Sequence, residues 1–191
     1  VSQSMVINET WKSAMSKYND VHYRNNVAYF GAGRGGLEIV DFSNPAAPVL
    51  LSRYECVTDA LKVHVKGTVA CLIDRQYGLM IFDVSNVRSP KLTYTYLPIR
   101  DYYYSDMDVY ARGDYAYLSV SGVGLMVFDI SNPKSPILVG AFADTEMTAT
   151  FFVQDNYAYA VKIGYYYHDR QAKSSGRRAK NSRRGDKSEV N

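Results

Sequence analysis

The sequence predicts an all-β fold, and three observations support this prediction. The 191 residues include 18 tyrosines and many valines and isoleucines, which are residue types that favour strands. A thirteen-residue motif occurs three times, at 36–48, 78–90 and 124–136. Each apolar segment around these motifs is short and is bounded by Gly, Asn, Asp or Pro, which indicates strands rather than helices.

The repeating unit contains four apolar segments. In the first unit these are DVHYR at 20–24, NNVAYFGAG at 25–33, LEIVD at 37–41 and VLLSRYE at 49–55. Leu37, Leu79 and Leu125 head the motif copies, at intervals of 42 and 46 residues. A period near 40–45 residues with four strands is the signature of β-propeller blades. We therefore expect β-propeller-type blades of four antiparallel strands.

The third segment, as in the second unit, is apolar on both faces. Within 78–83, Leu79 and Ile81 alternate with Met80 and Phe82. A strand needs this pattern only when both faces of its sheet are covered, and the packing of blade on blade covers them. A two-sheet sandwich would leave one face in water, so the pattern favours a propeller.

A turn follows each third segment. Asp, Ser and Asn side chains hydrogen-bond nearby backbone groups and Pro fixes φ, so together they predict a rigid turn before the fourth strand. The expected turn residues are Asp41, Asp83, Asp129, Pro48, Pro90 and Pro136. The prolines are expected to begin the fourth strands, where a lost N–H is tolerated. One carboxylate per blade lacks the clustered oxygens that Ca²⁺ prefers, so these residues predict no metal site.

A fourth unit begins but does not reach its motif. The segment 155–163 repeats the second strand, whereas 167–171 reads YHDRQ where a third strand is due. We therefore expect about three and a half blades, with repeats at 18–59, 60–105 and 106–147 and a partial repeat at 148–163. Because an open sheet edge must be protected, the sequence predicts either a fragment of a larger propeller or a homodimer of seven blades.

The two ends of the chain differ from the repeats. Residues 1–17 are expected to be weakly structured, and they lack the basic start and apolar stretch of a signal peptide. Residues 168–191 contain 8 Lys and Arg against 3 Asp and Glu, whereas 1–167 contain 14 against 16. A polar, basic segment cannot bury enough apolar surface to fold, so 164–191 is predicted to be a disordered tail. Its charge allows only weak, non-specific attraction to nucleic acid.

The motif resembles the LVIVD repeat. It reads Gly-Leu, β-branched or aromatic residues, Asp, an apolar residue, Ser-Asn-Pro, two residues and Pro; the second copy has Val87 where the others have Pro45 and Pro133. The resemblance covers about residues 18–163. It implies a β-propeller of bacterial or archaeal surface proteins, often exported and without a defined enzymatic role. It transfers no catalytic residue and no cofactor, and it places the chain at the cell surface or outside the cytoplasm.

One candidate site is a tyrosine cluster in a loop. Tyr102, Tyr103 and Tyr104 lie in the connection that lengthens the second interval to 46 residues. Recognition often resides in loops on a rigid scaffold, and tyrosine supplies contact area with a polar tip. These residues are therefore candidates for binding a protein or a glycan.

A second candidate site lies on the first strands. His22 and His64 occupy equivalent positions, and with Asp20 and Asp108 they are candidates for lining the mouth of a central channel. A metal or a small anion is conceivable there, and inheritance of a structural histidine through the repeat is the other interpretation.

Two functional classes follow from these features. The preferred one is a non-enzymatic repeat scaffold or binding module for a protein or a glycan, with no cofactor and no membrane span, since no run of about 18 apolar residues occurs. The alternative is a propeller enzyme, a hydrolase or a metal-dependent enzyme, with its site in the channel. No nucleophile, base and orienting acid recur together, so no catalytic residue is predicted.

Overall fold

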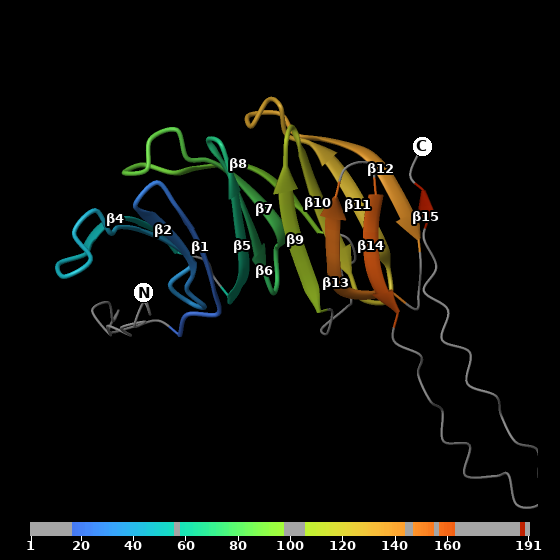
Figure 1. Ribbon diagram of the computed structural model, residues 1–191, viewed down its shortest axis with the longest axis horizontal. Helices are drawn as coiled ribbons and strands as arrows, with labels where there is room; N and C mark the ends of the chain where they lie inside the picture. The colour runs from blue at the N-terminus through green and yellow to red at the C-terminus, as the bar shows by residue number, and fades with distance from the viewer. Residues whose placement is uncertain are drawn as a thin grey trace, which may run out of the picture.

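The computed structural model describes residues 17–55, 58–97, 106–143, 147–154, 157–162 and 188–189 (Figure 1). These residues form strands and their connections, and no helix occurs among them. The predicted all-β fold is confirmed.

Three of the sheets are complete four-stranded blades, each antiparallel with its strands in chain order. Blade 1 consists of β1 (Asp20–Arg24), β2 (Val27–Gly31), β3 (Leu37–Asp41) and β4 (Val49–Tyr54). Blade 2 consists of β5 (Ala60–Lys66), β6 (Val69–Asp74), β7 (Gly78–Asp83) and β8 (Lys91–Tyr96). Blade 3 consists of β9 (Met107–Arg112), β10 (Tyr115–Val120), β11 (Gly124–Asp129) and β12 (Ile137–Ala143). Blade 4 consists of β13 (Met147–Gln154), β14 (Tyr157–Lys162) and β15 (Ser188–Glu189).

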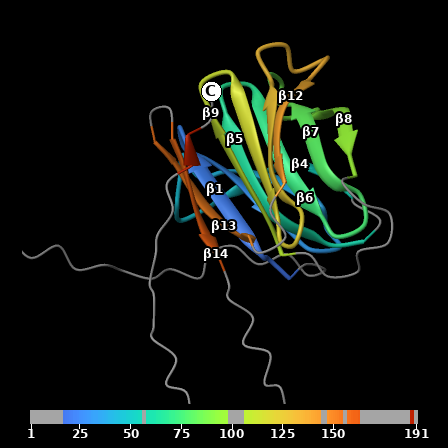
Figure 2. The same cartoon turned by 90° about the vertical axis from the view of Figure 1, so that its right-hand side faces the viewer.

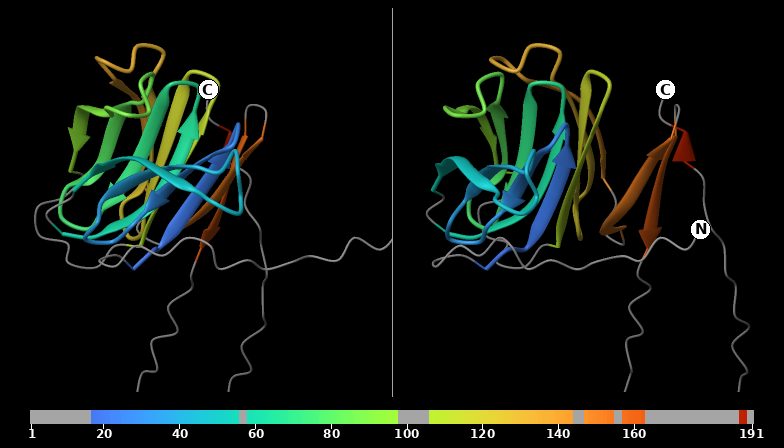
Figure 3. Two further views of the ribbon diagram at one scale, coloured as in Figure 1. Left: turned by 90° about the vertical axis from the view of Figure 1, so that its left-hand side faces the viewer. Right: turned by 60° about the vertical axis from the view of Figure 1, so that its left-hand side comes forward.

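The first strands of the four blades lie side by side in the order β1, β5, β9 and β13, which we call the inner row (Figure 1). The outer strands β4, β8 and β12 lie on the opposite side of the sheets (Figure 2). Consecutive sheets face one another like the blades of a propeller (Figure 3). This arrangement confirms the predicted propeller-type blades.

The core lies between the sheets. One cluster joins blades 1 and 2 and includes Tyr29, Leu37, Ile39, Val63, Leu72, Met80 and Phe82. A second cluster joins blades 2 and 3 and includes Cys71, Ile73, Leu79, Ile81, Val109, Leu118 and Phe128. The third strand β7 therefore contributes Met80 and Phe82 to one cluster and Leu79 and Ile81 to the other. Both faces of this strand are buried because a blade packs on each.

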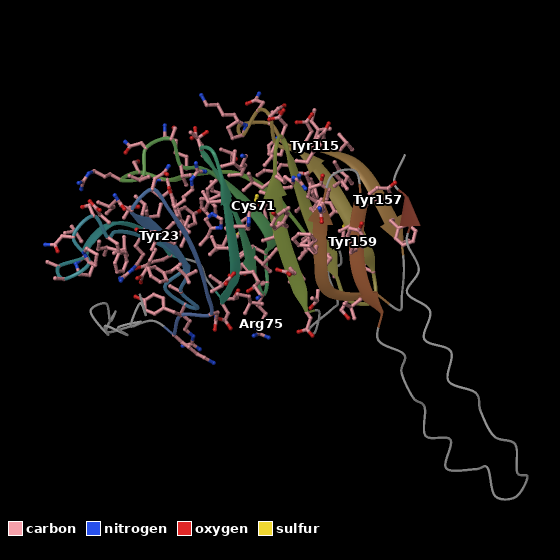
Figure 4. The ribbon with its side chains drawn as sticks, in the orientation of Figure 1. Tyr23, Cys71, Arg75, Tyr115, Tyr157 and Tyr159 are labelled. Atoms are coloured by element: carbon pink, nitrogen blue, oxygen red, sulfur yellow. The ribbon has the colours of Figure 1, made fainter. Side chains whose placement is uncertain are left out.

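Cys71 belongs to the second cluster and is labelled near the middle of the row of blades in Figure 4. Complete burial raises the pKa of its thiol to about 12. The thiol therefore stays protonated at neutral pH and serves as a small apolar side chain.

The turn after each third strand has the same hydrogen bonds in all three blades. The Oδ1 atoms of Asp41, Asp83 and Asp129 accept from the backbone N–H two residues later, at 2.7, 2.9 and 2.8 Å. Asn44, Asn86 and Asn132 accept in the same way from the residue two positions on, at 3.2, 3.0 and 3.1 Å. Hydrogen bonds from the serine two residues later lower the pKa of each aspartate. Pro48, Pro90 and Pro136 each lie one residue before the fourth strand.

The connection between β2 and β3 also joins blade 1 to blade 2. Gly33 and Ala60 exchange backbone hydrogen bonds of 3.2 and 2.9 Å between these blades. Gly33 has φ +53°, and a Cβ atom there would lie 2.9 Å from the carbonyl oxygen of Lys17. Gly33 therefore allows a turn at this position that other residue types would strain.

The ends of the chain lie largely outside the described residues, which include neither 1–16 nor most of 164–191. Within the predicted tail, Ser188–Glu189 form β15 and pair with Tyr157 and Ala158 of β14. The predicted boundaries at 17 and 164 remain predictions.

Candidate functional site

The candidate histidines meet on the inner row. His22 of β1, His64 of β5, Tyr110 of β9 and Phe152 of β13 occupy equivalent repeat positions, and we call these four side chains the inner aromatic stack. The ring centroids are separated by 4.5 Å for His22 and His64, 4.5 Å for His64 and Tyr110, and 6.4 Å for Tyr110 and Phe152. The stack therefore runs across all four blades.

Two of the predicted channel residues hydrogen-bond the backbone of the next blade. The first strand of a blade is a sheet edge, so the N–H groups on its open side need partners. Asp20 Oδ2 accepts from the N–H of Val63 at 3.0 Å, and His64 Nδ1 accepts from the N–H of Ala111 at 3.0 Å. Asp20 thus links blade 1 to blade 2, and His64 links blade 2 to blade 3.

Arginines on the same strands complete this pattern. Arg24 and Arg112 are equivalent residues, and each donates across a blade boundary. Arg24 donates to the carbonyl of Gly67 at 3.2 Å, and Arg112 donates to the carbonyl of Val153 at 3.2 Å. Nothing in the repeat motif points to these arginines, although the alternation along DVHYR places Arg24 on the same face as Asp20 and His22.

The histidines of the stack are neutral at physiological pH. Burial, followed by repulsion from His22 and opposed by Asp20, lowers the pKa of His64 to about 4. Burial and then Arg24 lower the pKa of His22. Because Nδ1 of His64 accepts a hydrogen bond, the neutral ring carries its proton on Nε2.

Asp108 lies at the position equivalent to Asp20 but makes a different contact. Its Oδ1 accepts from the N–H of Val109 at 2.9 Å. Burial raises the pKa of this carboxyl group, and the hydrogen bond from Val109 and the charge of Lys62 oppose the increase. Nowhere in the part of the chain that the structure describes do three His, Cys, Asp or Glu side chains group closely enough to hold a metal ion.

The other predicted binding residues, Tyr102, Tyr103 and Tyr104, lie outside the described residues. Their role as a recognition loop stays a prediction.

A buried ion pair on blade 1 was not predicted. Glu38 is 0% exposed, and it accepts from Tyr18 Oη at 2.8 Å and from Arg53 Nε at 3.0 Å. Its neighbours in β3, Leu37 and Ile39, face blade 2, so Glu38 lies on the face of blade 1 that is turned away from the other blades. The sequence does contain a signal, because Glu38 occupies the motif position that Met80 and Met126 hold in the other copies.

A second buried carboxylate joins the residues just before β5 to the turn between β6 and β7. Asp74 is fully buried and accepts from the N–H groups of Asp59, Gln76 and Tyr77 at 3.1, 2.8 and 2.9 Å. The hydroxyl group of Thr58 also donates to it. These four donors satisfy the carboxylate, which fits a structural role.

The fold and the inner row define a β-propeller-type repeat protein in which polar side chains join one blade to the next. The LVIVD repeat model matches residues 17–56, 58–97 and 105–144. The chain therefore belongs to the LVIVD-repeat family, as its motif predicted.

Comparison with solved structures shows the same fold at low sequence identity. The computationally designed Ika4 protein is similar with a TM-score of 0.62 and 13% identity, over 85% of this chain and 93% of that chain. BamB from Moraxella catarrhalis is similar with a TM-score of 0.60 and 16% identity, over 79% of this chain and 45% of that chain. Sqt1 from Saccharomyces cerevisiae is similar with a TM-score of 0.56 and 8% identity, over 68% of this chain and 36% of that chain.

The chain thus spans less than half the length of the BamB and Sqt1 chains. A search of curated proteins found no match. None of the described residues belongs to a helix of the length and hydrophobicity that a membrane span requires.

Proposed function

We propose that this chain is a non-enzymatic binding module, in which stacked blades form a rigid scaffold and the loops hold a protein or a glycan outside the cytoplasm. The observation that supports this proposal is that Asp20 and His64 make hydrogen bonds between blades. Each hydrogen-bonds a backbone N–H of the next blade, which is a structural role. Asp20, His64, Arg24 and Arg112 of the inner row thus connect blades, and the proposal assigns recognition to the loops.

The proposed binding surface contains Tyr102, Tyr103 and Tyr104. It is tested by replacing all three with Ser and screening the wild type and the variant against a glycan array and a panel of purified envelope proteins. We expect the variant to lose at least tenfold in affinity for any ligand of the wild type while keeping the same melting temperature. Tyr115→Ser is the matched control, because Tyr115 is an exposed tyrosine on β10, within a blade. Equal binding by the triple variant would refute the loop assignment.

A separate thermal-shift measurement tests the metal-dependent form of the enzymatic alternative. A ligand that binds only the folded state must raise the melting temperature. If Zn²⁺, Mn²⁺ or Ca²⁺ raised the melting temperature of the wild type and not that of a His22→Ala, His64→Ala double variant, the inner row would be a metal site. The scaffold proposal expects no such difference.

A further inference from the structure

Within the described residues, the second strand of blade 4 has a complete partner on one side and a partner along only part of its length on the other. In blades 1–3 the second strand pairs with the first strand on one side. On the other side it pairs along its whole length with the third strand (β3, β7 or β11), which carries the repeat motif and is called the motif strand below. In blade 4, β14 pairs with β13, but on its other side only Tyr157 and Ala158 pair with β15. Among the described residues, no strand pairs with 159–162 on that side.

β15 occupies the position of the motif strand. Tyr157 pairs with Glu189 as Val27 pairs with Asp41, and as the equivalent residues of blades 2 and 3 pair with Asp83 and Asp129. Ser188 thus stands where the motif has Val40, Phe82 or Phe128. Ser188 and Glu189 therefore supply only two residues where the other blades have a motif strand of five or six residues.

The outer strand of blade 3 is also uncovered beside this place. Tyr54 and Tyr96 pack on the motif phenylalanines of the next blade, with centroid distances of 4.9 Å to Phe82 and 5.0 Å to Phe128. Their equivalent on β12 is Phe142, which is 46% exposed. Val139 is 53% exposed, whereas its equivalent Leu51 packs on the core between blades 1 and 2. Phe142 and Val139 thus lack the cover that a motif strand provides elsewhere.

We propose that the open edge of β14, together with Val139 and Phe142 of β12, is a docking site for an extended segment of another polypeptide that carries the repeat motif. The segment would add to β14 as a third strand, with main-chain hydrogen bonds for affinity and side-chain contacts for specificity. Its phenylalanine would pack on Phe142 as Phe82 packs on Tyr54. The proposal is independent of the tyrosine loop, so either can fail alone.

The hydrogen-bonding residues follow from the other blades. Backbone bonds from Phe42 N to Asn26 O and from Ala32 N to Gly36 O show that alternate residues of β2, starting at Asn26, face β3. The equivalents in β14 are Ala158, Ala160 and Lys162. Ala160 is the informative position, because its N–H faces the docking site and does not bond to β13.

A folded second copy of this chain does not fit the site as well. Its motif strands β3, β7 and β11 are buried and paired on both sides. The exposed face of its blade 1 carries the Glu38 ion pair, where the other blades present methionine. A free motif segment offers the missing backbone partners without opening a blade.

The test uses a synthetic peptide with the sequence of residues 124–132, GLMVFDISN, extended by two lysines for solubility and labelled with fluorescein. Binding to the full chain is measured by fluorescence anisotropy. We expect saturable binding, weakened at least tenfold by Ala160→Pro, which removes the N–H, and unchanged by Ala160→Val, which keeps it. Ser188→Pro should tighten binding at least threefold, because it prevents β15 from pairing with Ala158.

Further variants cover the case in which Ala160→Pro does not fold. Phe142→Ala changes only an exposed side chain and should weaken binding at least fivefold, as should a peptide with Ser in place of its Phe. Absence of saturable binding to both the wild type and the Ser188→Pro variant would overturn the proposal. So would binding that neither Ala160→Pro nor Phe142→Ala changes, or dimerisation of the chain that excludes the peptide, because this face would then belong to a second copy.

Discussion

The two ends of the row of blades differ in chemistry, although the same repeat builds both. At the blade 1 end, the outward face contains the buried Glu38, its partner Arg53 and the hydroxyl of Tyr18. At the other end, β12 and β14 present apolar and aromatic side chains to solvent, among them Phe142 and Tyr159. Figure 4 shows Tyr23 at the first end and Tyr157 and Tyr159 at the second.

The difference shows how one repeat can serve two purposes. Tyr29 is 5% exposed because blade 2 covers it, whereas its equivalent Tyr159 is 43% exposed. The blade 1 end replaces an apolar contact with an ion pair that its own residues satisfy. The opposite end keeps exposed apolar residues at positions that a neighbouring blade covers elsewhere, which is why we propose a docking site there.

The largest expected effect comes from breaking the blade 1 end. Glu38→Ala removes one member of a buried pair, and we expect it to lower the free energy of unfolding by about 3 kcal/mol. The double variant Glu38→Met, Arg53→Thr copies the cross-strand pair Met80 and Thr95 of blade 2. It should be within about 1 kcal/mol of the wild type, since uncharged side chains that pack well can replace a buried ion pair. Urea denaturation measures both. A loss below about 1 kcal/mol for Glu38→Ala would show that the ion pair does not stabilise this face.

The second prediction compares equivalent aromatic residues in blades 2 and 3. Tyr96 packs on the buried Phe128, so Tyr96→Ala should cost about 2 kcal/mol. Phe142→Ala should cost less than about 1 kcal/mol, because the residue is 46% exposed. The two variants are compared by urea denaturation. Similar losses would mean that Phe142 is already covered in the free chain, which contradicts an open end.

The third prediction concerns pH. The pKa of His64 falls from 6.5 in the unfolded chain to about 4 in the fold, so between these values the unfolded state binds more protons. Stability linked to His64 is therefore present above pH 6.5 and is lost as the pH falls towards 4. The loss is on the order of 1 kcal/mol, less than the full shift gives, because the ring is partly exposed to solvent.

The comparison that isolates this contribution is His64→Asn, which keeps an acceptor for Ala111 but does not titrate. Its melting temperature should fall less steeply than that of the wild type between pH 6.5 and 4. Phe152→Ala, at the exposed end of the inner aromatic stack, should leave the steepness unchanged. Parallel profiles for the wild type and His64→Asn would show that His64 titrates normally in the fold.

The smallest effects are expected at the turns, which are alike in all three complete blades. Asp41→Ala, Asp83→Ala and Asp129→Ala should each lower the melting temperature slightly and by similar amounts at pH 7. The folded-state pKa of each aspartate is lowered, so this contribution is present above about pH 3.8 and disappears as the carboxylate is protonated in acid. Unequal effects at pH 7 would mean that the two ends also differ in local turn stability.

The sequence predicted the blades because their signals are local and repeated. The alternation in β7 indicated a strand buried on both faces, and the Asp-Ser-Asn turn indicated where the next strand begins. It also placed His22 and His64 at equivalent positions, which lie 4.5 Å apart between ring centroids. The backbone partner of His64 was not predictable, because it depends on how closely two blades approach.

The amino-acid sequence by itself thus determined the strands of the blades, the turn before each fourth strand and membership of the LVIVD-repeat family, because a period-2 pattern and a turn act over a few residues. Only the tertiary structure decided the roles of the polar side chains. Whether Glu38 is buried, whether His64 meets the N–H of Ala111 and whether Phe142 stays exposed depend on contacts between residues of different blades. Those contacts, rather than the motif, distinguish the closed end of this molecule from the open one.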